Sequence, residues 1–287
     1  MTRRIAVANN KGGTAKSTTA CNLADMLARG LVGPEGEIRG RVLLVDLDPQ
    51  GHVARSLGLR DRVYDKDKNP GGACISFLLA GEREFKRCVV AADRAGDGLP
   101  RPNLYVIPST QRLRHAGGRL AAMDYAARQS GDPEHVPLED VLSARLGGFA
   151  HAFEFIIVDC PPNLDYFRRP VYRFVEEVIV PVRPDDLSVD GLVQHTRDLL
   201  EMNNEGARVR LTHVLPTMAR PRQVLDQFSM GMLSERYGRI VASPIPDLVA
   251  VREAPARDGR TLMEYAPDSA ATTAYREFAK RVAGRGE

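Results

Sequence analysis

Short apolar runs rich in β-branched residues recur along the chain and alternate with segments of helical periodicity. Two of the runs, 42–45 and 155–158, are apolar without interruption, which is typical of strands buried on both faces of a parallel sheet. Apolar residues recur at helical spacing in 17–29 and 187–203. This alternation predicts an α/β fold: a doubly wound, mostly parallel sheet flanked by helices, with ligand loops at the carboxyl ends of its strands. The predicted strands are 4–8, 42–45, 104–107, 155–158, 177–182, 209–215 and 240–242.

The length of the chain sets the expected number of domains. Its 287 residues, 43% of them hydrophobic, can bury a sizeable core. No internal repeat, low-complexity tail or linker divides the sequence, so we expect a single domain over 1–287. Three segments rich in glycine or charge, 30–40, 60–72 and 128–137, are expected to be loops or insertions.

Composition favours a cytoplasmic protein. No stretch approaches the roughly 18 unbroken apolar residues of a membrane span. The N-terminus leads directly into an apolar run without the pattern of a signal peptide. The four cysteines are scattered, which predicts reduced thiols and neither a disulfide framework nor a metal cluster. The net charge of +3 is too small to indicate a nucleic-acid partner by itself.

A candidate phosphate-binding loop follows the first apolar run. Residues 9–18 read Asn-Asn-Lys-Gly-Gly-Thr-Ala-Lys-Ser-Thr and precede a helical segment. A strand that leads into a loop of small residues and then a helix presents successive N–H groups to a phosphate. Gly12 and Gly13 let the backbone approach the β-phosphate, Lys16 supplies charge to the β- and γ-oxygens, and the Ser17 hydroxyl can bind Mg²⁺. Thr18, at the helix N-terminus, is placed to reach the α-phosphate.

The loop departs from the usual pattern at two positions. The pattern G-x-x-x-x-G-K-[ST] calls for glycine where this chain has Asn10 and Ala15, and Lys11 adds a second cation. Taken alone, the loop sequence could instead be a glycine-rich turn capped by Ser17. Lys11 could instead be a solvated loop lysine.

Carboxylates follow two of the predicted strands. Asp46 and Asp48, at positions i and i+2 of an extended segment, are expected to point the same way and face a bound metal and its water. The alternative is that 48–51 simply forms a turn, which leaves Asp46 unexplained. Asp159 directly follows the apolar run 155–158. An apolar strand followed by one aspartate is the Walker B arrangement, in which the aspartate reaches the metal through water.

Three motifs in this order, K-G-G-x-x-K-[ST] at 11–17, D-x-D-P-Q-G at 46–51 and D-C-P-P at 159–162, resemble those of the ParA/MinD family of deviant Walker A (SIMIBI-class) ATPases, and the last two resemble its ParA/Soj-like branch. The resemblance implies a P-loop NTPase fold, ATP and Mg²⁺ as cofactors, and weak ATPase activity that a partner stimulates. It implies catalytic roles for Lys11, Lys16 and Asp48 and metal contacts from Ser17, Asp46 and Asp159. The implied nucleotide contacts are Lys11, Gly12, Gly13, Thr14, Ala15, Lys16, Ser17 and Thr18, with Met218, Pro246 and Asp247 near the base.

The resemblance also implies partners. In the family, the lysine that corresponds to Lys11 crosses to the ATP of a second subunit, which implies an ATP-dependent sandwich homodimer. The ParA branch binds DNA nonspecifically and partitions plasmids or chromosomes with a ParB-like activator, which implies association with the nucleoid. The implied DNA contacts are Arg220, Arg222 and Arg252, each of which is equally suited to be a solvated arginine.

Two other functions stay open. The chain can be a ParA-like ATPase whose cargo is a protein assembly, such as a carboxysome, chemotaxis or division complex. A MinD-like, membrane-associated ATPase is disfavoured, because the apolar residues of the last helical segment, 270–283, suit core packing. We therefore expect no membrane partner.

Overall fold

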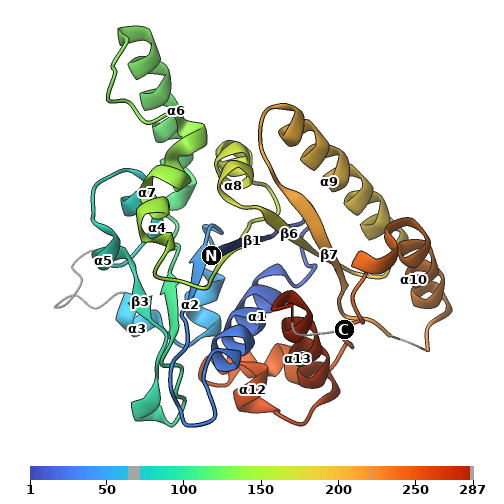
Figure 1. The fold of residues 1–287 in the computed structure, drawn as a ribbon. Helices are drawn as coiled ribbons and strands as arrows, with labels where there is room; N and C mark the ends of the chain where they lie inside the picture. Colours follow the sequence, from blue (N-terminus) through green and yellow to red (C-terminus); the bar gives the residue numbers. More distant parts are fainter. Residues whose placement is uncertain (64–71, 221, 285–287) are drawn as a thin grey trace.

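The computed structural model describes residues 1–63, 72–220 and 222–284, which form one seven-stranded sheet in the order β3-β4-β2-β5-β1-β6-β7 (Figure 1). The strands are β1 (Arg3–Val7), β2 (Val42–Asp46), β3 (Val90–Ala91), β4 (Leu104–Ile107), β5 (Phe155–Asp159), β6 (Glu177–Val182) and β7 (Arg210–Pro216). All neighbouring strands are parallel except the edge pair β3 and β4. The predicted mostly parallel, doubly wound sheet is confirmed.

Helices cover both faces of the sheet because alternate residues of its central strands point to opposite sides. In β1, Ile5 and Val7 belong to one buried cluster, whereas Ala6 belongs to the other. On the face of Ile5 lie α1 (Lys16–Gly30), α2 (His52–Ser56), α3 (Arg60–Val63), α11 (Val249–Ala256), α12 (Leu262–Tyr265) and α13 (Ala270–Val282). On the face of Ala6 lie α4 (Ile75–Leu79), α5 (Phe85–Cys88), α6 (Leu113–Ser130), α7 (Val141–Ala150), α8 (Arg168–Phe174), α9 (Asp186–Asn204) and α10 (Val224–Tyr237).

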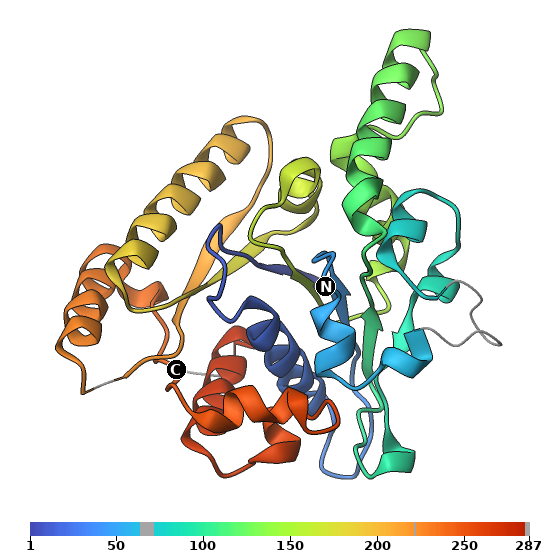
Figure 2. The same cartoon turned by 180° about the vertical axis from the view of Figure 1, so that it is seen from behind.

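Helix α6 extends well beyond the rest of the molecule in both views (Figures 1 and 2). Only four of its residues, those nearest the sheet, are buried: Leu113, Ala116, Gly117 and Leu120. Within the described ranges, no helix has both the length and the apolar character that a membrane crossing requires.

The structure corrects the predicted strand at 240–242. Its first residue belongs to a 3₁₀ turn, Gly238–Ile240, and Val241 contributes only an isolated bridge to Val214. With Ile240 in the turn, the two residues that remain are too few to extend the sheet beyond β7. The antiparallel strand β3 was not predicted, because two residues carry no recognisable periodicity.

The loop predictions hold in part. In segment 30–40, Gly30 ends α1, and residues 31–40 contain no helix or strand, only an isolated bridge between Val32 and Ile38. The predicted loop 60–72 begins with the short helix α3, and its residues 64–71 lie outside the described residues. The predicted loop 128–137 starts three residues late, because α6 continues to Ser130 and ends at Gly131, whose φ of 66° suits a helix terminus.

Candidate nucleotide-binding site

The candidate phosphate loop connects β1 to α1 at the carboxyl edge of the sheet (Figure 1). Gly13 has a φ of 73° and Ala15 a φ of 62°, both in the left-handed region. Glycine adopts this conformation without penalty, whereas alanine pays roughly 1–2 kcal/mol. Ala15 therefore has the left-handed backbone conformation for which the usual pattern uses glycine. Its carbonyl accepts the N–H of Thr19 at 2.8 Å at the start of α1.

Lys16 is buried and turned back onto its own loop. Its Nζ donates to the carbonyl oxygen of Lys11 at 2.8 Å, and the residue is 7% exposed. Burial lowers the pKa of Lys16, and the charges of Asp159 and Asp48 oppose that shift. The predicted phosphate lysine and the two predicted carboxylates thus share one electrostatic environment.

Asp46 and Asp159 face each other across neighbouring strands. They are register partners on β2 and β5, and both are fully buried. Burial raises the pKa of Asp46 well above its ordinary value, and the charge of Asp159 raises it further. Burial also raises the pKa of Asp159, while Ser17 and Lys16 act in the opposite direction. Two carboxylates held this close in a buried place favour a cation nearby.

The two carboxylates differ in their hydrogen bonds. Asp46 accepts the backbone N–H of Asp48 at 2.8 Å and that of Val53 at 3.2 Å, one on each oxygen. Neither oxygen of Asp159 accepts a well-formed hydrogen bond from the described part of the chain. Asp46 therefore secures the turn that begins α2, whereas the unsatisfied oxygens of Asp159, with Ser17 nearby, suit a hydrated metal ion. Among the described residues, no three His, Cys, Asp or Glu side chains form a metal-binding group.

Asp48 lies in the turn that Asp46 secures. Its Oδ1 accepts the backbone N–H of Gln50 at 2.9 Å, and its carbonyl accepts the N–H of Gly51 at 2.9 Å. Residues 48–51 thus form a turn, which was the alternative interpretation of this segment. Asp48 also contributes negative charge to the environment of Lys16.

Lys11 makes contacts within its own subunit. Its Nζ lies 3.1 Å from Oδ1 of Asp185, in the connection between β6 and α9. Each of these side chains is about one-third exposed, at 32% and 31%. Asn9, two residues before Lys11, also connects the loop to β6. Its Nδ2 donates to the carbonyl of Pro181 at 2.7 Å, and its Oδ1 accepts the N–H of Lys11 at 2.9 Å. No sequence pattern marks Asp185 as a partner of Lys11, because the two residues are 174 positions apart.

The two segments predicted to lie near the base are side by side. Ala219 and Pro246 form a parallel bridge, next to Met218, whose φ is 54°. Thr217 links this region to the phosphate loop, since its hydroxyl donates to the carbonyl of Thr14 at 3.2 Å. Residues that follow β7 and residues that precede α11 therefore meet beside the loop.

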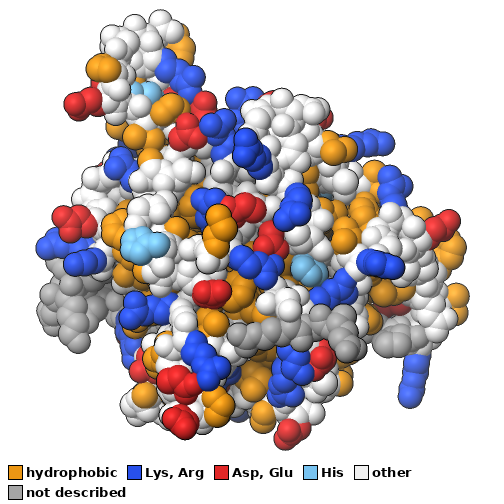
Figure 3. Space-filling view, viewed as in Figure 1, with side chains coloured by type: hydrophobic (Ala, Val, Ile, Leu, Met, Phe, Trp, Pro, Cys, Tyr) orange, Lys and Arg blue, Asp and Glu red, His pale blue; other side chains and the backbone are white. Residues whose placement is uncertain are grey.

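Asp247 is engaged by two of the predicted DNA-contacting arginines. Arg220 approaches one carboxylate oxygen at 2.7 Å and Arg252 approaches the other at 3.1 Å. Arg222 is exposed, and no described side chain pairs with it. Figure 3 shows Lys and Arg side chains interspersed with acidic ones on the visible face, where they do not gather into one continuous basic patch.

Helix α10, which follows Arg220 and Arg222 along the chain, has an unusual outer face that no sequence motif marks. The large apolar residues exposed on it are Val224, Leu225, Phe228 and Met232. Its buried residues include the polar Asp226 and Ser229.

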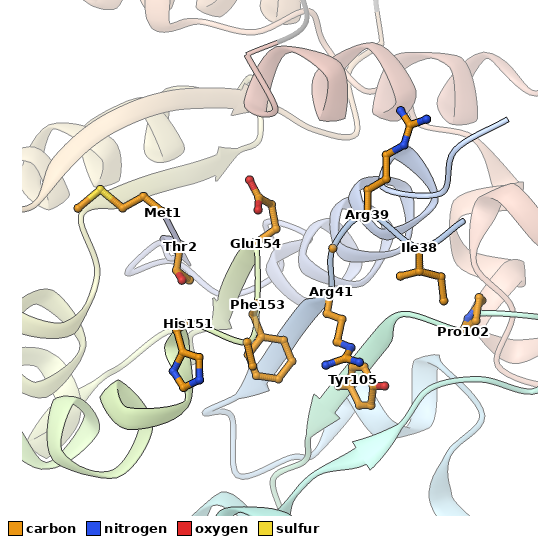
Figure 4. Close-up of a pocket in the computed structure, with 12 residues that line it drawn as sticks. Met1, Thr2, Ile38, Arg39, Arg41, Pro102, Tyr105, His151, Phe153 and Glu154 are labelled. Atoms are coloured by element: carbon orange, nitrogen blue, oxygen red, sulfur yellow. The ribbon is translucent and has the colours of Figure 1, made fainter. Parts of the chain in front are cut away.

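A hollow of about 690 Å³ lies at the opposite edge of the sheet (Figure 4). It is lined by residues around the starts of β1, β2 and β5, among them Thr2, Arg41 and Glu154. Since the phosphate loop follows the carboxyl end of β1, this hollow is separate from the candidate nucleotide site.

The fold and the site define a P-loop nucleotide-binding protein. The model of the AAA domain family AAA_31 matches residues 2–211. The chromosome-partitioning ATPase Soj of Thermus thermophilus is 31% identical over 287 residues, which cover 99% of this chain and 96% of that protein. The sporulation initiation inhibitor protein Soj of Bacillus subtilis is 28% identical, with all of both chains covered. The chain belongs to the ParA/MinD family, in its Soj-like branch.

A solved structure agrees with this assignment. The crystal structure of cobyrinic acid a,c-diamide synthase from Mycobacterium smegmatis with bound ADP and magnesium matches with a TM-score of 0.72 and 27% identity. The match covers 99% of this chain and 94% of that one.

Proposed function

We propose that this protein is a ParA-type ATPase that binds ATP with Mg²⁺, forms an ATP-dependent homodimer, binds DNA nonspecifically and partitions a chromosome or plasmid with a ParB-like activator. The observation that carries the proposal is the carboxylate of Asp159, fully buried beside the phosphate loop with no well-formed hydrogen bond from the described residues. A buried, unsatisfied carboxylate next to Lys16 and Ser17 has the chemistry of a metal–phosphate site. Names and ligands of the relatives agree with it.

The proposed roles follow from the contacts of each side chain. Ser17 would hold Mg²⁺ directly and Asp159 through water, and the ion would neutralise charge on the phosphates. Lys16 would exchange the carbonyl of Lys11 for phosphate oxygens by a rotation of its flexible side chain. Asp48 would orient the attacking water, and Asp46 would support it by holding the turn in which it lies.

The proposed dimer requires Lys11 to leave Asp185. The pair is about one-third exposed on both sides, and such ion pairs contribute only about 0–1 kcal/mol. A triphosphate on a second subunit carries more negative charge than one carboxylate and can therefore compete for the ammonium. Lys11 would then stabilise charge on the transferred phosphoryl group, a role in which a cation supplied by a second protein raises rates by about 10³–10⁵.

The proposed DNA contact is electrostatic. Arg220 and Arg252 share Asp247, so the group of three keeps one net positive charge, to which Arg222 adds another. Contacts of this kind recognise phosphates without reading bases and weaken steeply with salt. We expect the protein in the cytoplasm, associated with the nucleoid and with no membrane partner.

The experiment that tests this function compares ATP turnover and ATP-dependent dimerisation in the wild type and three variants. Lys16→Ala should lose nucleotide binding, and Lys11→Ala should bind ATP but fail to dimerise. Asp48→Ala should accumulate as the ATP-bound dimer because hydrolysis is blocked. Lys280→Ala, which removes a surface lysine paired with Glu277, is the matched control and should behave as wild type. A wild type that neither hydrolyses ATP nor dimerises with it would refute the proposal.

A protein cargo in place of DNA is the second candidate function. The apolar outer face of α10 favours it, because exposed Val224 and Phe228 suit a protein surface better than a phosphate backbone. If the ATP-bound dimer forms but does not bind duplex DNA at low salt, the proposed ATP switch stands and this candidate replaces DNA partition.

A further inference from the structure

Asn10 occupies a position where the usual phosphate-loop pattern has glycine, and its side chain makes two specific contacts. Its Nδ2 donates to Oδ2 of Asp198 at 2.8 Å, and its Oδ1 lies 3.2 Å from Nδ1 of His195. Both partners lie on α9 and are buried, with His195 1% and Asp198 8% exposed. Glycine at position 10 could make neither contact.

The chemistry of the groups sets the direction of these hydrogen bonds. Because the Asn10 amide donates its N–H to a carboxylate, its oxygen is the acceptor, and Nδ1 of His195 must carry the proton. Burial lowers the pKa of His195 to about 4, so the ring is neutral near pH 7. Its Nε2 is then an acceptor and lies 3.5 Å from the hydroxyl of Tyr172 on α8.

Asp198 is itself firmly held. Gln194 donates to its Oδ1 at 3.1 Å, and Arg168 approaches the same oxygen at 2.8 Å. Burial acts to raise the pKa of Asp198, but the hydrogen bonds from Asn10 and Gln194 and the charge of Arg168 lower it overall. The carboxylate is therefore charged at neutral pH and remains a strong acceptor for Asn10.

We propose that His195 and Asp198 are positioning residues that, through Asn10, hold the first turn of the phosphate loop against α9; we call these three residues the Asn10 clamp. The contact is important for the loop because Asn10 directly precedes Lys11, whose carbonyl accepts the Lys16 ammonium. Displacement of Asn10 would displace both lysines. The inference rests on the proposed function only in taking ATP as the ligand of this loop.

The test measures the loop without nucleotide and then its affinity for ATP. The first readout is hydrogen–deuterium exchange of a peptide spanning residues 9–16, which includes the Lys11 N–H bonded to Asn9. The second is the dissociation constant for ATP with Mg²⁺. His195→Leu removes the donor to Asn10 while filling the space. His195→Asn returns an amide N–H close to the Nδ1 position and is the conservative rescue.

His213 provides the matched control. It is also a buried histidine whose pKa is lowered by burial to about 4, but it lies on β7 and packs edge-on against Phe278. His213→Leu therefore removes a comparable buried ring away from the Asn10 clamp. For His195→Leu we expect about tenfold faster exchange in the loop and about tenfold weaker ATP binding, the effect of losing one hydrogen bond that holds the loop. His195→Asn and His213→Leu should stay within about twofold of wild type on both readouts.

Equal effects of His195→Leu and His213→Leu would overturn the inference, because they would show general destabilisation. Failure of His195→Asn to restore the loop would overturn it as well. If His195→Leu does not fold, Asn10→Ala at the exposed end of the clamp replaces it, and wild-type exchange in that variant would refute the proposal. If the wild type does not bind ATP, the proposed function fails, while exchange in the nucleotide-free protein still decides the positioning role.

Discussion

The phosphate loop and the surface around Arg220 present their cations in different ways. Lys16 is buried and bonded to a carbonyl of its own loop, beside two buried carboxylates. Arg220 and Arg252 keep 51% and 64% of their side-chain surface exposed and share a single carboxylate, Asp247. Interactions of buried charges are strong and little screened, whereas those of exposed charges are weak and depend on salt.

One chain thus combines a site that holds its ligand in one position with a surface that can bind its ligand in many registers. Buried groups at the phosphate loop leave few alternative arrangements, which suits a ligand that must be placed within a fraction of an ångström. The arginine surface can bind a polyanion in many registers, which suits nonspecific binding. Substitutions at the loop should therefore produce large effects, and those on the arginine surface smaller, salt-dependent ones.

The largest effect should come from Asp159→Asn. ATP turnover should fall by about 10²–10³, because the proposed metal contact is lost. The same change should stabilise the nucleotide-free protein to urea by about 1–2 kcal/mol, since a buried charge that faces Asp46 is removed. Asp46→Asn is the contrasting control and should destabilise the protein, because an amide cannot accept both backbone N–H groups. Destabilisation by Asp159→Asn would contradict this account.

Acid should remove the stability that two buried histidines contribute to the folded protein. Burial lowers the pKa of both His195 and His213 to about 4, from an ordinary value of 6.5. Below pH 6.5 the unfolded chain binds protons at these two histidines that the folded chain does not, so their contribution to the free energy of unfolding falls as the pH drops toward 4 and then levels off. The raised pKa values of Asp46 and Asp159 act in the opposite direction, so the histidine contribution is obtained by comparing variants with the wild type. Each histidine contributes up to about 3 kcal/mol. Urea unfolding at several pH values should show a smaller fall in His213→Leu, and an unchanged slope would exclude that histidine.

The double substitution Arg220→Ala with Arg252→Ala should weaken DNA binding about tenfold in low salt. It should also reduce the slope of log affinity against log salt by about 2, one for each lost phosphate contact. ATP turnover without DNA is measured in parallel, because both arginines contact Asp247, which is predicted to lie near the base, and a loss of turnover would show an effect on the nucleotide site instead of on DNA binding. Arg119→Ala, which breaks a surface pair with Glu82, serves as the control. An unchanged salt slope would remove these arginines from the DNA contact.

The smallest effect should come from Asp185→Asn. Removal of its charge weakens the hold on Lys11, so ATP-dependent dimerisation should occur at about two- to fivefold lower protein concentration. Analytical ultracentrifugation with ATP gives this value directly. Weaker dimerisation in the variant would show that Asp185 supports the dimer, contrary to this interpretation.

Local patterns predicted most of the sheet. Runs such as 42–45 and 155–158 became β2 and β5, because an uninterrupted apolar strand is stable only when covered on both faces. Segment 240–242 was predicted wrongly as a strand, because Ile240 belongs to a 3₁₀ turn and Val241 pairs with β7 only through an isolated bridge. Strand β3 escaped prediction because its pairing with β4, and not its composition, defines it.

The sequence by itself determined the parallel sheet, the phosphate loop and the carboxylates at the strand ends, because each depends on neighbours within a few residues. Only the tertiary structure decided that Asn10 meets His195, 185 residues away, and that Lys11 meets Asp185. It also decided that Arg220 and Arg252 share Asp247. Such contacts arise from the way β1, β6 and α9 pack together, and residue type alone does not specify which polar side chains that packing brings within hydrogen-bond distance.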